Sequence, residues 1–130
     1  MTDAQGVPLS AFTTSAQVAE VSTIETLVDV RPLRKRPERL VYDKAADADW
    51  LRAALGQRGI EQVTPHRSNR RKAPLQDRRK LRRYRRRWKI ERTISWLGHH
   101  RRLLVRHEYY AQLFEGFLHW ACLLLCLRWF

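Results

Sequence analysis

The sequence is poor in cysteine, in acidic residues and in long apolar runs. Cysteine occurs only at positions 122 and 126, and no signal peptide opens the chain, which predicts a reducing, cytoplasmic setting rather than a disulfide-built secreted domain. The strictly apolar run near the end covers residues 120–127, well short of the roughly 20 residues that a membrane span needs. Aspartate and glutamate number 13 against 26 lysines and arginines, which leaves a net charge of +13. Such a surplus favours a polyanionic partner, either nucleic acid or an anionic membrane surface.

Apolar residues make up 44% of the 130-residue chain and include five tryptophans, which is enough for a core in one domain or part of one. Residues 109–130 predict an apolar helix, and its length favours a buried helix packed behind a sheet, with no membrane partner. His119, Cys122 and Cys126 share a face of this helix, but small core cysteines are a better interpretation than a zinc site. A basic protein that is anchored to a membrane surface by this tail remains an alternative.

The N-terminal third predicts a turn and a short helix. Residues 3–6 carry a turn signal, residues 7–12 alternate weakly as a strand, and residues 19–30 suit a helix. Asp3 stands beside the turn glycine, where an aspartate acts as a turn former far more often than as a catalytic group.

A strand–helix–strand unit follows. Residues 39–42 read as a buried strand, a helix capped by Asp47 or Asp49 comes next, and residues 60–65 form a second strand. This order implies a parallel pair with a right-handed crossover. Asp43 then sits at the carboxyl end of a strand, where α/β sheets place ligand chemistry, although a loop aspartate paired with a neighbouring lysine explains it equally well at this point.

The positive charge is concentrated between residues 66 and 107. Residues 66–77 predict a mobile basic loop, and residues 78–107 predict a long helix that Gly98 interrupts. His99 and His100 diverge by about 100° on such a helix, so phosphate contacts are expected of them rather than a shared metal ion.

Glu91 is the single acid in this long helix. At helical spacing it shares a face with Tyr84, Arg87 and Ser95, while an apolar flank is left for a core. One interpretation is an i,i+4 pair of Glu91 with Arg87 on a solvated face. The other is a metal-binding carboxylate in a DNA-binding surface. The apolar flank consists of Leu81, Trp88, Ile90, Ile94 and Leu97.

The same face carries a recognisable motif. It reads Tyr84-x2-Arg87-x3-Glu91, followed by Arg92 and by Trp-Leu-Gly at residues 96–98. This pattern resembles the C-terminal signature of bacterial insertion-sequence transposases of the DDE superfamily.

Two further blocks, residues 43–49 and residues 101–108, also resemble that family, and the resemblance runs over residues 3–130. Two positions depart from the family pattern. Gly98 stands where a lysine often follows the glutamate, and Ala46 stands where the upstream block usually has a tyrosine.

The resemblance implies an α/β fold, a partial RNase H-like domain, and DNA strand cleavage and transfer by two divalent ions, normally Mg²⁺ with Mn²⁺ as a substitute. It implies that Asp43 and Glu91 are the second and third metal-binding carboxylates, with side chains roughly 4–8 Å apart given the spacing of two ions. The first carboxylate would lie on a strand before Met1. The residues implied to position the phosphodiester or to hold the DNA backbone are Tyr84, Arg87, Lys89, Arg92, Arg101 and Arg102.

Residues 1–130 are accordingly expected to be the C-terminal portion of a transposase catalytic domain, truncated or encoded by a split gene, and inactive alone. The expected partners are double-stranded DNA and either the upstream transposase fragment or further copies of the chain. The alternative is a non-catalytic, basic nucleic-acid-binding module.

Overall fold

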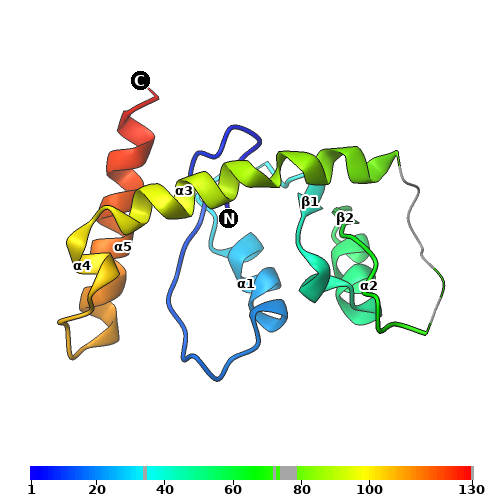
Figure 1. Ribbon diagram of the computed structural model, residues 1–130, viewed down its shortest axis with the longest axis horizontal. Coiled ribbons are helices and arrows are strands. Elements are labelled where there is room, and N and C mark those ends of the chain that lie inside the picture. The colour runs from blue at the N-terminus through cyan, green and yellow to red at the C-terminus, as the bar shows by residue number, and fades with distance from the viewer. Residues whose placement is uncertain (34, 72, 74–78, 130) are drawn as a thin grey trace.

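A long helical rod organises the computed structural model, which describes residues 1–33, 35–71, 73 and 79–129. The rod consists of the 3-10 helix η3 (Lys80–Arg87) and the α-helix α3 (Trp88–Gly98), which run on from one another. A small sheet and helix α2 lie near one end of the rod, helix α1 lies beside its middle, and helix α5 lies at the other end (Figure 1). Residues 72 and 74–77 of the predicted basic loop, and residue 78 at the start of the predicted long helix, lie outside the described residues.

The sheet is a parallel pair. Strand β1 (Arg39–Val41) pairs with β2 (Glu61–Val63) in a register that places Leu40 opposite Gln62. The 3-10 turn η2 (Lys44–Ala46) and helix α2 (Asp49–Gln57) connect the strands. The predicted strand–helix–strand unit and the mixed α/β character are therefore confirmed.

The sequence predicted the C-terminal end of α2 correctly but not its N-terminal cap. Gly59, just beyond the helix, has a φ of 72°, a conformation that a side chain disfavours, and it ends the helix as predicted. The predicted cap is wrong, because Ala48 is the N-cap and no side-chain capping hydrogen bond forms there. Asp47 turns its carboxylate to a different set of partners, and Asp49 is the first helical residue.

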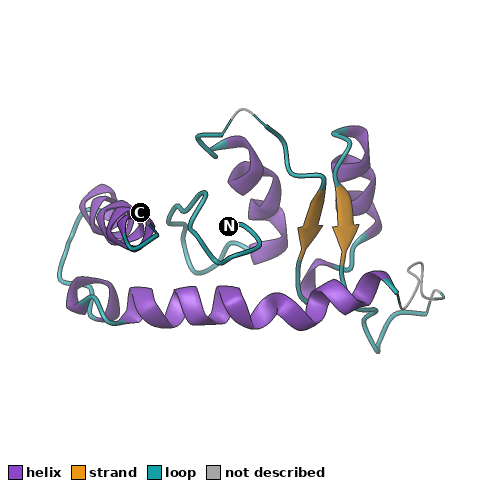
Figure 2. Ribbon diagram, turned by 90° about the horizontal axis from the view of Figure 1, so that it is seen from above, coloured by secondary structure: helices purple, strands orange, loops and turns teal. Residues whose placement is uncertain are grey.

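The core lies between the sheet and two helices. Helix α1 (Ile24–Asp29), preceded by the 3-10 turn η1 (Glu20–Thr23), buries Ile24 and Val28, which are spaced one turn apart. Helix α2 buries Leu51 and Leu55 at the same spacing. These four side chains join Ala46 and Ile60 in one cluster, which holds α1 and α2 beside the strands (Figure 2).

The N-terminal turn forms, but the weak strand after it does not extend. An isolated antiparallel bridge joins Thr2 to Pro8. The Oδ1 atom of Asp3 accepts hydrogen bonds from Gln5 N at 2.8 Å and from Val7 N at 2.9 Å. Asp3 is thus a turn former, as expected, and residues 9–12 join no strand.

The long basic helix is interrupted where the glycine stands. Helix α3 ends at Gly98, and a short helix α4 (Arg101–Leu104) follows after a break. Glycine costs about 1 kcal/mol in a helix interior, so the rod ends where its propensity is lowest.

The tail forms helix α5 (Ala111–Leu127), but its predicted place behind the sheet is wrong. The helix contacts α3 and α4 at the opposite end of the rod (Figure 1). Ala121 and Leu125 are its buried residues, because only one narrow face meets neighbours. None of the helices in the described part of the chain is long and apolar enough to cross a membrane. The exposed large apolar residues of the tail are Leu113, Phe117, Trp120, Leu123, Leu124, Leu127 and Trp129.

Candidate active site

The carboxyl ends of both strands face the helical rod. Figure 2 shows the two arrowheads pointing at it, and η3 contacts β1 and β2. Asp43, two residues beyond β1, is partly buried, and its Oδ1 atom accepts a hydrogen bond from Ala45 N at 2.8 Å as the cap of η2. The strand end therefore delivers one carboxylate toward η3.

Helix η3 has one row of partly buried side chains and exposed arginines on its other sides. A 3-10 helix has three residues per turn, so Leu81, Tyr84 and Arg87 lie one above another, and all three are partly buried. The arginines between them are exposed on the other sides of the helix: Arg82, Arg83, Arg85 and Arg86. The rod thus presents tyrosine and one arginine inward and a dense positive charge outward.

Arg87 is the centre of the site. Its Nη1 atom donates to Tyr84 Oη at 3.0 Å, its Cζ lies 5.8 Å from the centroid of the Tyr84 ring, and its Nη2 lies 3.5 Å from Glu91 Oε1. Burial alone would lower the pKa of Arg87, but the hydrogen bond to Tyr84 and the charges of Asp43 and Glu91 outweigh it and raise the pKa. Tyr84 and Glu91 therefore contact the Arg87 guanidinium, and Asp43 follows a strand that contacts the same 3-10 helix.

Tyr42 is the residue before Asp43. Burial raises the pKa of its phenol, the negative charges of Glu20 and Asp43 raise this pKa further, and the charge of Arg87 acts in the opposite direction. The distance between the Asp43 and Glu91 carboxylates stays a prediction.

The described residues do not fit a complete metal site. Asp43 and Glu91 offer the hard carboxylate oxygens that Mg²⁺ prefers. No group of three or more His, Cys, Asp or Glu side chains, however, is placed to hold an ion in the described ranges. These two carboxylates alone fall short of the donor set for two ions.

Two of the cations predicted to bind DNA contact the N-terminal turn. Lys89 Nζ donates to Ala4 O at 2.7 Å and to Gln5 Oε1 at 3.1 Å, and Arg92 Nη2 donates to Gln5 O at 2.9 Å. The Arg92 guanidinium also stacks near the rings of two tryptophans, at 5.0 and 4.7 Å from the centroids of Trp88 and Trp96. Both cations fasten the first residues of the chain to α3.

Thr93 completes this attachment, and the sequence did not signal it. Its side chain is buried, and Oγ1 donates to Gly6 O at 2.6 Å. The role of the Thr93 hydroxyl can be recognised only when the position of the N-terminal turn that covers it is known.

The two predicted cations on α4 differ from each other. Arg102 Nη1 lies 2.8 Å from Glu108 Oε1, and its Cζ lies 5.4 Å from the centroid of the Phe117 ring. Arg101 is exposed. Arg102 therefore links α4 to the tail, whereas Arg101 faces solvent.

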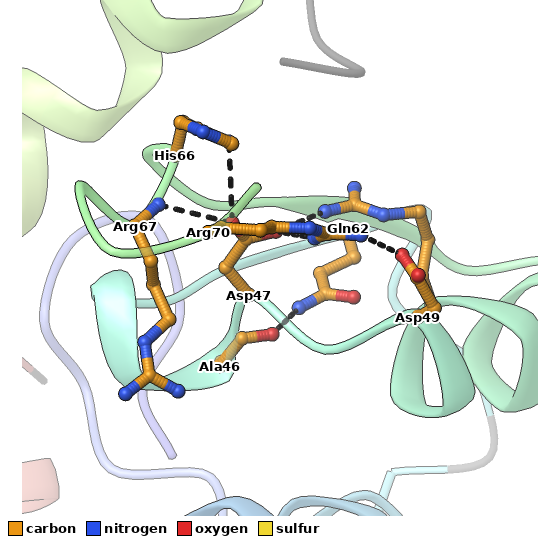
Figure 3. A network of polar contacts seen from close by, with 8 residues as sticks. Ala46, Asp47, Asp49, Gln62, His66, Arg67 and Arg70 are labelled. Carbon is orange, nitrogen blue, oxygen red and sulfur yellow. Dashed lines mark hydrogen bonds and ion pairs between the residues drawn. The ribbon is translucent and has the colours of Figure 1, made fainter. Parts of the chain in front are cut away.

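A carboxylate that sequence reasoning treated only as a cap holds the start of the basic loop (Figure 3). Asp47 is 7% exposed, and its Oδ2 accepts a hydrogen bond from Arg67 N at 3.0 Å. Its Oδ1 lies 2.6 Å from Arg70 Nη1 and 3.0 Å from Arg52 Nη2, and His66 Nδ1 is 3.5 Å from Oδ2. The segment after β2 is thereby fastened over the crossover.

This network sets the charge state of Asp47. Burial alone would raise the pKa of the carboxyl, but the hydrogen bond from Arg67 N and the charges of Arg70 and Arg52 outweigh it and lower the pKa. Arg70 also pairs with Asp49, and Gln62 donates to Ala46 O beneath the network. Arg70 therefore bridges two acids of the crossover, a contact that the sequence spacing did not reveal.

Comparison with known proteins decides the family. The model of the transposase DDE domain matches residues 1–127. The chain belongs to the DDE transposase family. A curated relative from Burkholderia cepacia, named "Putative transposase for insertion sequence element IS402", is 39% identical to it over 134 aligned positions.

The alignment covers 97% of this DDE-family chain but 60% of the length of the relative. The family recognised from the motif around Glu91 is thus confirmed. No solved structure matches the chain.

Proposed function

We propose that this chain acts in DNA transposition as the C-terminal portion of a catalytic domain with an RNase H-like α/β arrangement. The observation that carries the proposal is the contact of Arg87 with Tyr84 and Glu91 on a helical rod that meets a parallel strand pair, with Asp43 following the first strand. Carboxyl ends of strands are where α/β sheets place their ligands. The family match supports the same assignment.

In this proposal Asp43 and Glu91 are two of the carboxylates that hold Mg²⁺, and a further carboxylate comes from outside the described residues. The chain covers 60% of the length of its relative, so the part of a transposase that this chain does not cover is the proposed source. Tyr84 and Arg87 lie on the face of Glu91, where they would orient a phosphodiester.

The DNA backbone is proposed to lie along the outer side of η3. Its exposed arginines, at positions 82, 83, 85 and 86, repeat every third residue and so stand about 6 Å apart along each ridge. Lys89 and Arg92 are engaged by the N-terminal turn, so η3 is the better candidate for the phosphate contacts. Such contacts fix position on the duplex and carry no sequence information.

Fluorescence anisotropy of a labelled duplex, titrated with salt in EDTA, tests this interface. Contact with about six phosphates predicts that the logarithm of the affinity falls with the logarithm of the salt concentration at a slope near −5. A slope near zero would refute an electrostatic interface on this chain.

A second candidate function is a non-catalytic nucleic-acid-binding module, which the incomplete metal site favours. An end-labelled duplex carrying insertion-sequence termini separates the two functions. The chain alone is expected to bind the duplex without nicking it. Addition of the upstream part of the relative, with Mg²⁺ or Mn²⁺, is expected to produce nicking that Glu91→Gln abolishes. Binding without nicking in that mixture would favour the module.

A further inference from the structure

A hollow lies where α5 crosses the end of α3 (Figure 1). It has a volume of about 450 Å³ and is lined by Trp96, His99, His100 and Arg128. Sites for small molecules in proteins have volumes of roughly 300–1,000 Å³, so the hollow has room for one such group. None of its four residues belongs to the candidate active site.

The end of α3 brings the two histidines to the same hollow. Neighbouring side chains of an uninterrupted helix point about 100° apart, which is why the sequence predicted that His99 and His100 diverge. The helix ends at Gly98, however. His99 keeps helical backbone angles as the C-cap, whereas His100 is extended, with φ −83° and ψ 106°. Because the backbone changes direction between them, both side chains line one hollow.

The lining combines an aromatic wall with basic groups. Trp96 is partly buried, and the Arg92 Cζ atom lies over its ring at 4.7 Å from the centroid. An indole has two faces, so a second flat group can stack on the face that Arg92 does not cover. Arg128 is exposed beyond the end of α5, and the described lining contains no acid. The hollow therefore suits a ligand that is flat and apolar in one part and anionic in another.

We propose that this hollow binds one unpaired nucleotide of a DNA strand, with its base on Trp96 and its phosphate held by Arg128 beside the two imidazoles. The inference rests on the proposed function and deepens it, because it adds a site for a strand end to the interface for the duplex. Every base has a π-face, so stacking on an indole tolerates any sequence. A guanidinium forms two parallel, charge-assisted hydrogen bonds to a phosphate.

The hollow lies within reach of a duplex on η3. Trp96 comes ten residues after Arg86, which corresponds to roughly 15 Å along the rod at about 1.5 Å per residue. A DNA strand covers this distance in about four nucleotides, at roughly 3.4 Å each. A strand end can therefore enter the hollow while its duplex stays on the exposed arginines of η3.

The affinities of two labelled duplexes in EDTA test the site. One duplex is blunt, and the other carries one unpaired nucleotide at its 5′ or its 3′ end. The wild type is expected to bind the overhang duplex about tenfold more tightly in at least one polarity, which equals about 1.4 kcal/mol. The Trp96→Leu variant is expected to bind both duplexes equally, with its affinity for the blunt one unchanged within about twofold, because only the stacking platform is lost.

Two further variants separate stacking from a change in fold. Trp96→Tyr keeps an aromatic ring and is expected to keep most of the preference for the overhang. Trp50→Leu removes a tryptophan that is 51% exposed on α2, away from the hollow, and is expected to keep the full preference. A tenfold preference in Trp96→Leu, or its loss in Trp50→Leu as well, would overturn the site.

The phosphate contact is tested by Arg128→Gln. This variant is expected to reduce the preference for the overhang to about threefold or less, because the phosphate of the unpaired nucleotide loses its guanidinium. Arg36→Gln is the matched control, since it removes the same charge from an exposed residue of the linker. Equal reductions in the two variants would show that net charge decides the preference, and would remove Arg128 from the site.

A fluorescent base distinguishes a strand end from a free nucleotide. With 2-aminopurine as the unpaired base, fluorescence is expected to fall when the wild type binds, because stacking on an indole quenches it, and to stay unchanged in Trp96→Leu. The free monophosphate of 2-aminopurine deoxynucleoside is expected to bind far more weakly than the overhang duplex. Equal affinity of the two probes would assign the hollow to a soluble nucleotide and would overturn the proposal.

The two proposals fail in different ways. A protein that binds blunt DNA with a steep salt dependence but shows no preference for the overhang keeps the duplex interface and loses the hollow. A protein that shows a preference dependent on Trp96 but no salt dependence with blunt DNA keeps the hollow and loses the proposed interface on η3.

Discussion

At the scale of single residues, one glycine and one aspartate decide how distant segments meet. Gly6 allows the N-terminal turn to lie against α3, and Asp47 fastens the segment after β2 over the crossover. Neither residue belongs to the candidate active site. Gly6 lies against the helix that carries Glu91, and Asp47 holds the segment that follows the second strand of the sheet.

Gly6→Ala is expected to lower the free energy of unfolding by about 1–3 kcal/mol. Gly6 has a φ of 95°, and an added Cβ would lie 3.0 Å from Thr93 Oγ1 and 3.2 Å from Lys89 O. Thermal unfolding followed by circular dichroism measures the change. Gly116→Ala is the control, because a Cβ there meets nothing within 4 Å on helix α5, and it is expected to stabilise by about 0.5–1 kcal/mol. Equal melting temperatures for Gly6→Ala and the wild type would show that the turn does not need glycine.

Asp47→Asn is expected to cost about 2–4 kcal/mol at neutral pH, because Arg52 and Arg70 lose their buried counter-charge. Chemical denaturation at several pH values measures this. The folded pKa of Asp47 is lowered, so the stabilisation is fully present above the unfolded value of about 3.9 and is lost as the pH falls through the folded value. The gap between the wild type and the variant should therefore close in acid.

The control for Asp47 is Asp29→Asn, which removes an acid from an exposed pair with Arg58. Exposed pairs contribute up to about 1 kcal/mol, so the cost should be small. A cost for Asp29→Asn as large as that for Asp47→Asn would contradict the special role of the buried carboxylate.

At the scale of elements, η3 matters because of its 3-10 geometry. An α-helix would spread the arginines around its axis, whereas three residues per turn stack them in ridges. The inward ridge ends at Arg87, and α3 then places Glu91 one turn later. The helical spacing predicted this shared face correctly, since Tyr84 and Arg87 are neighbours in either kind of helix.

The double variant Arg82→Gln with Arg86→Gln is expected to make the salt dependence of DNA binding shallower by about 2 in slope, one unit for each lost phosphate contact. Anisotropy titrations with a labelled duplex measure it. Lys35→Gln with Arg36→Gln removes the same charge from two exposed residues of the linker and should leave the slope almost unchanged. Equal effects of the two double variants would mean that only net charge matters, not the ridge.

At the scale of the whole molecule, the chain has two unequal ends. The sheet end buries a continuous cluster of six residues, whereas α5 leaves large apolar side chains exposed. Contiguous apolar surface of this kind marks an interaction site or a tendency to associate.

The purified chain is accordingly expected to self-associate as its concentration rises, through the exposed side of α5. Sedimentation velocity at increasing concentration measures this. Trp120→Gln with Leu127→Gln, both on exposed positions, should reduce association without loss of helicity. Val30→Gln is the matched control, because it removes an exposed apolar side chain far from α5 in the sequence. A wild-type chain that stays monomeric throughout would contradict the expectation.

What the sequence determined by itself is local. Short buried strands on either side of a stretch with helical spacing predicted the strand–helix–strand unit and the place of Asp43 after β1, and the spacing of Tyr84, Arg87 and Glu91 predicted their common face. These features depend on the period of a single element, which neighbouring residues set.

What the tertiary structure decided is which surfaces of those elements meet. The family resemblance implied that Lys89 and Arg92 hold DNA, but it did not reveal their partners in the N-terminal turn, which lie 84–87 positions away in the sequence. The apolar pattern of α5 was right, yet its place at the far end of the rod depends on contacts with α3 and α4. Such long-range contacts depend on the packing of the whole chain, because burial and charge pairing are satisfied among elements and not within one.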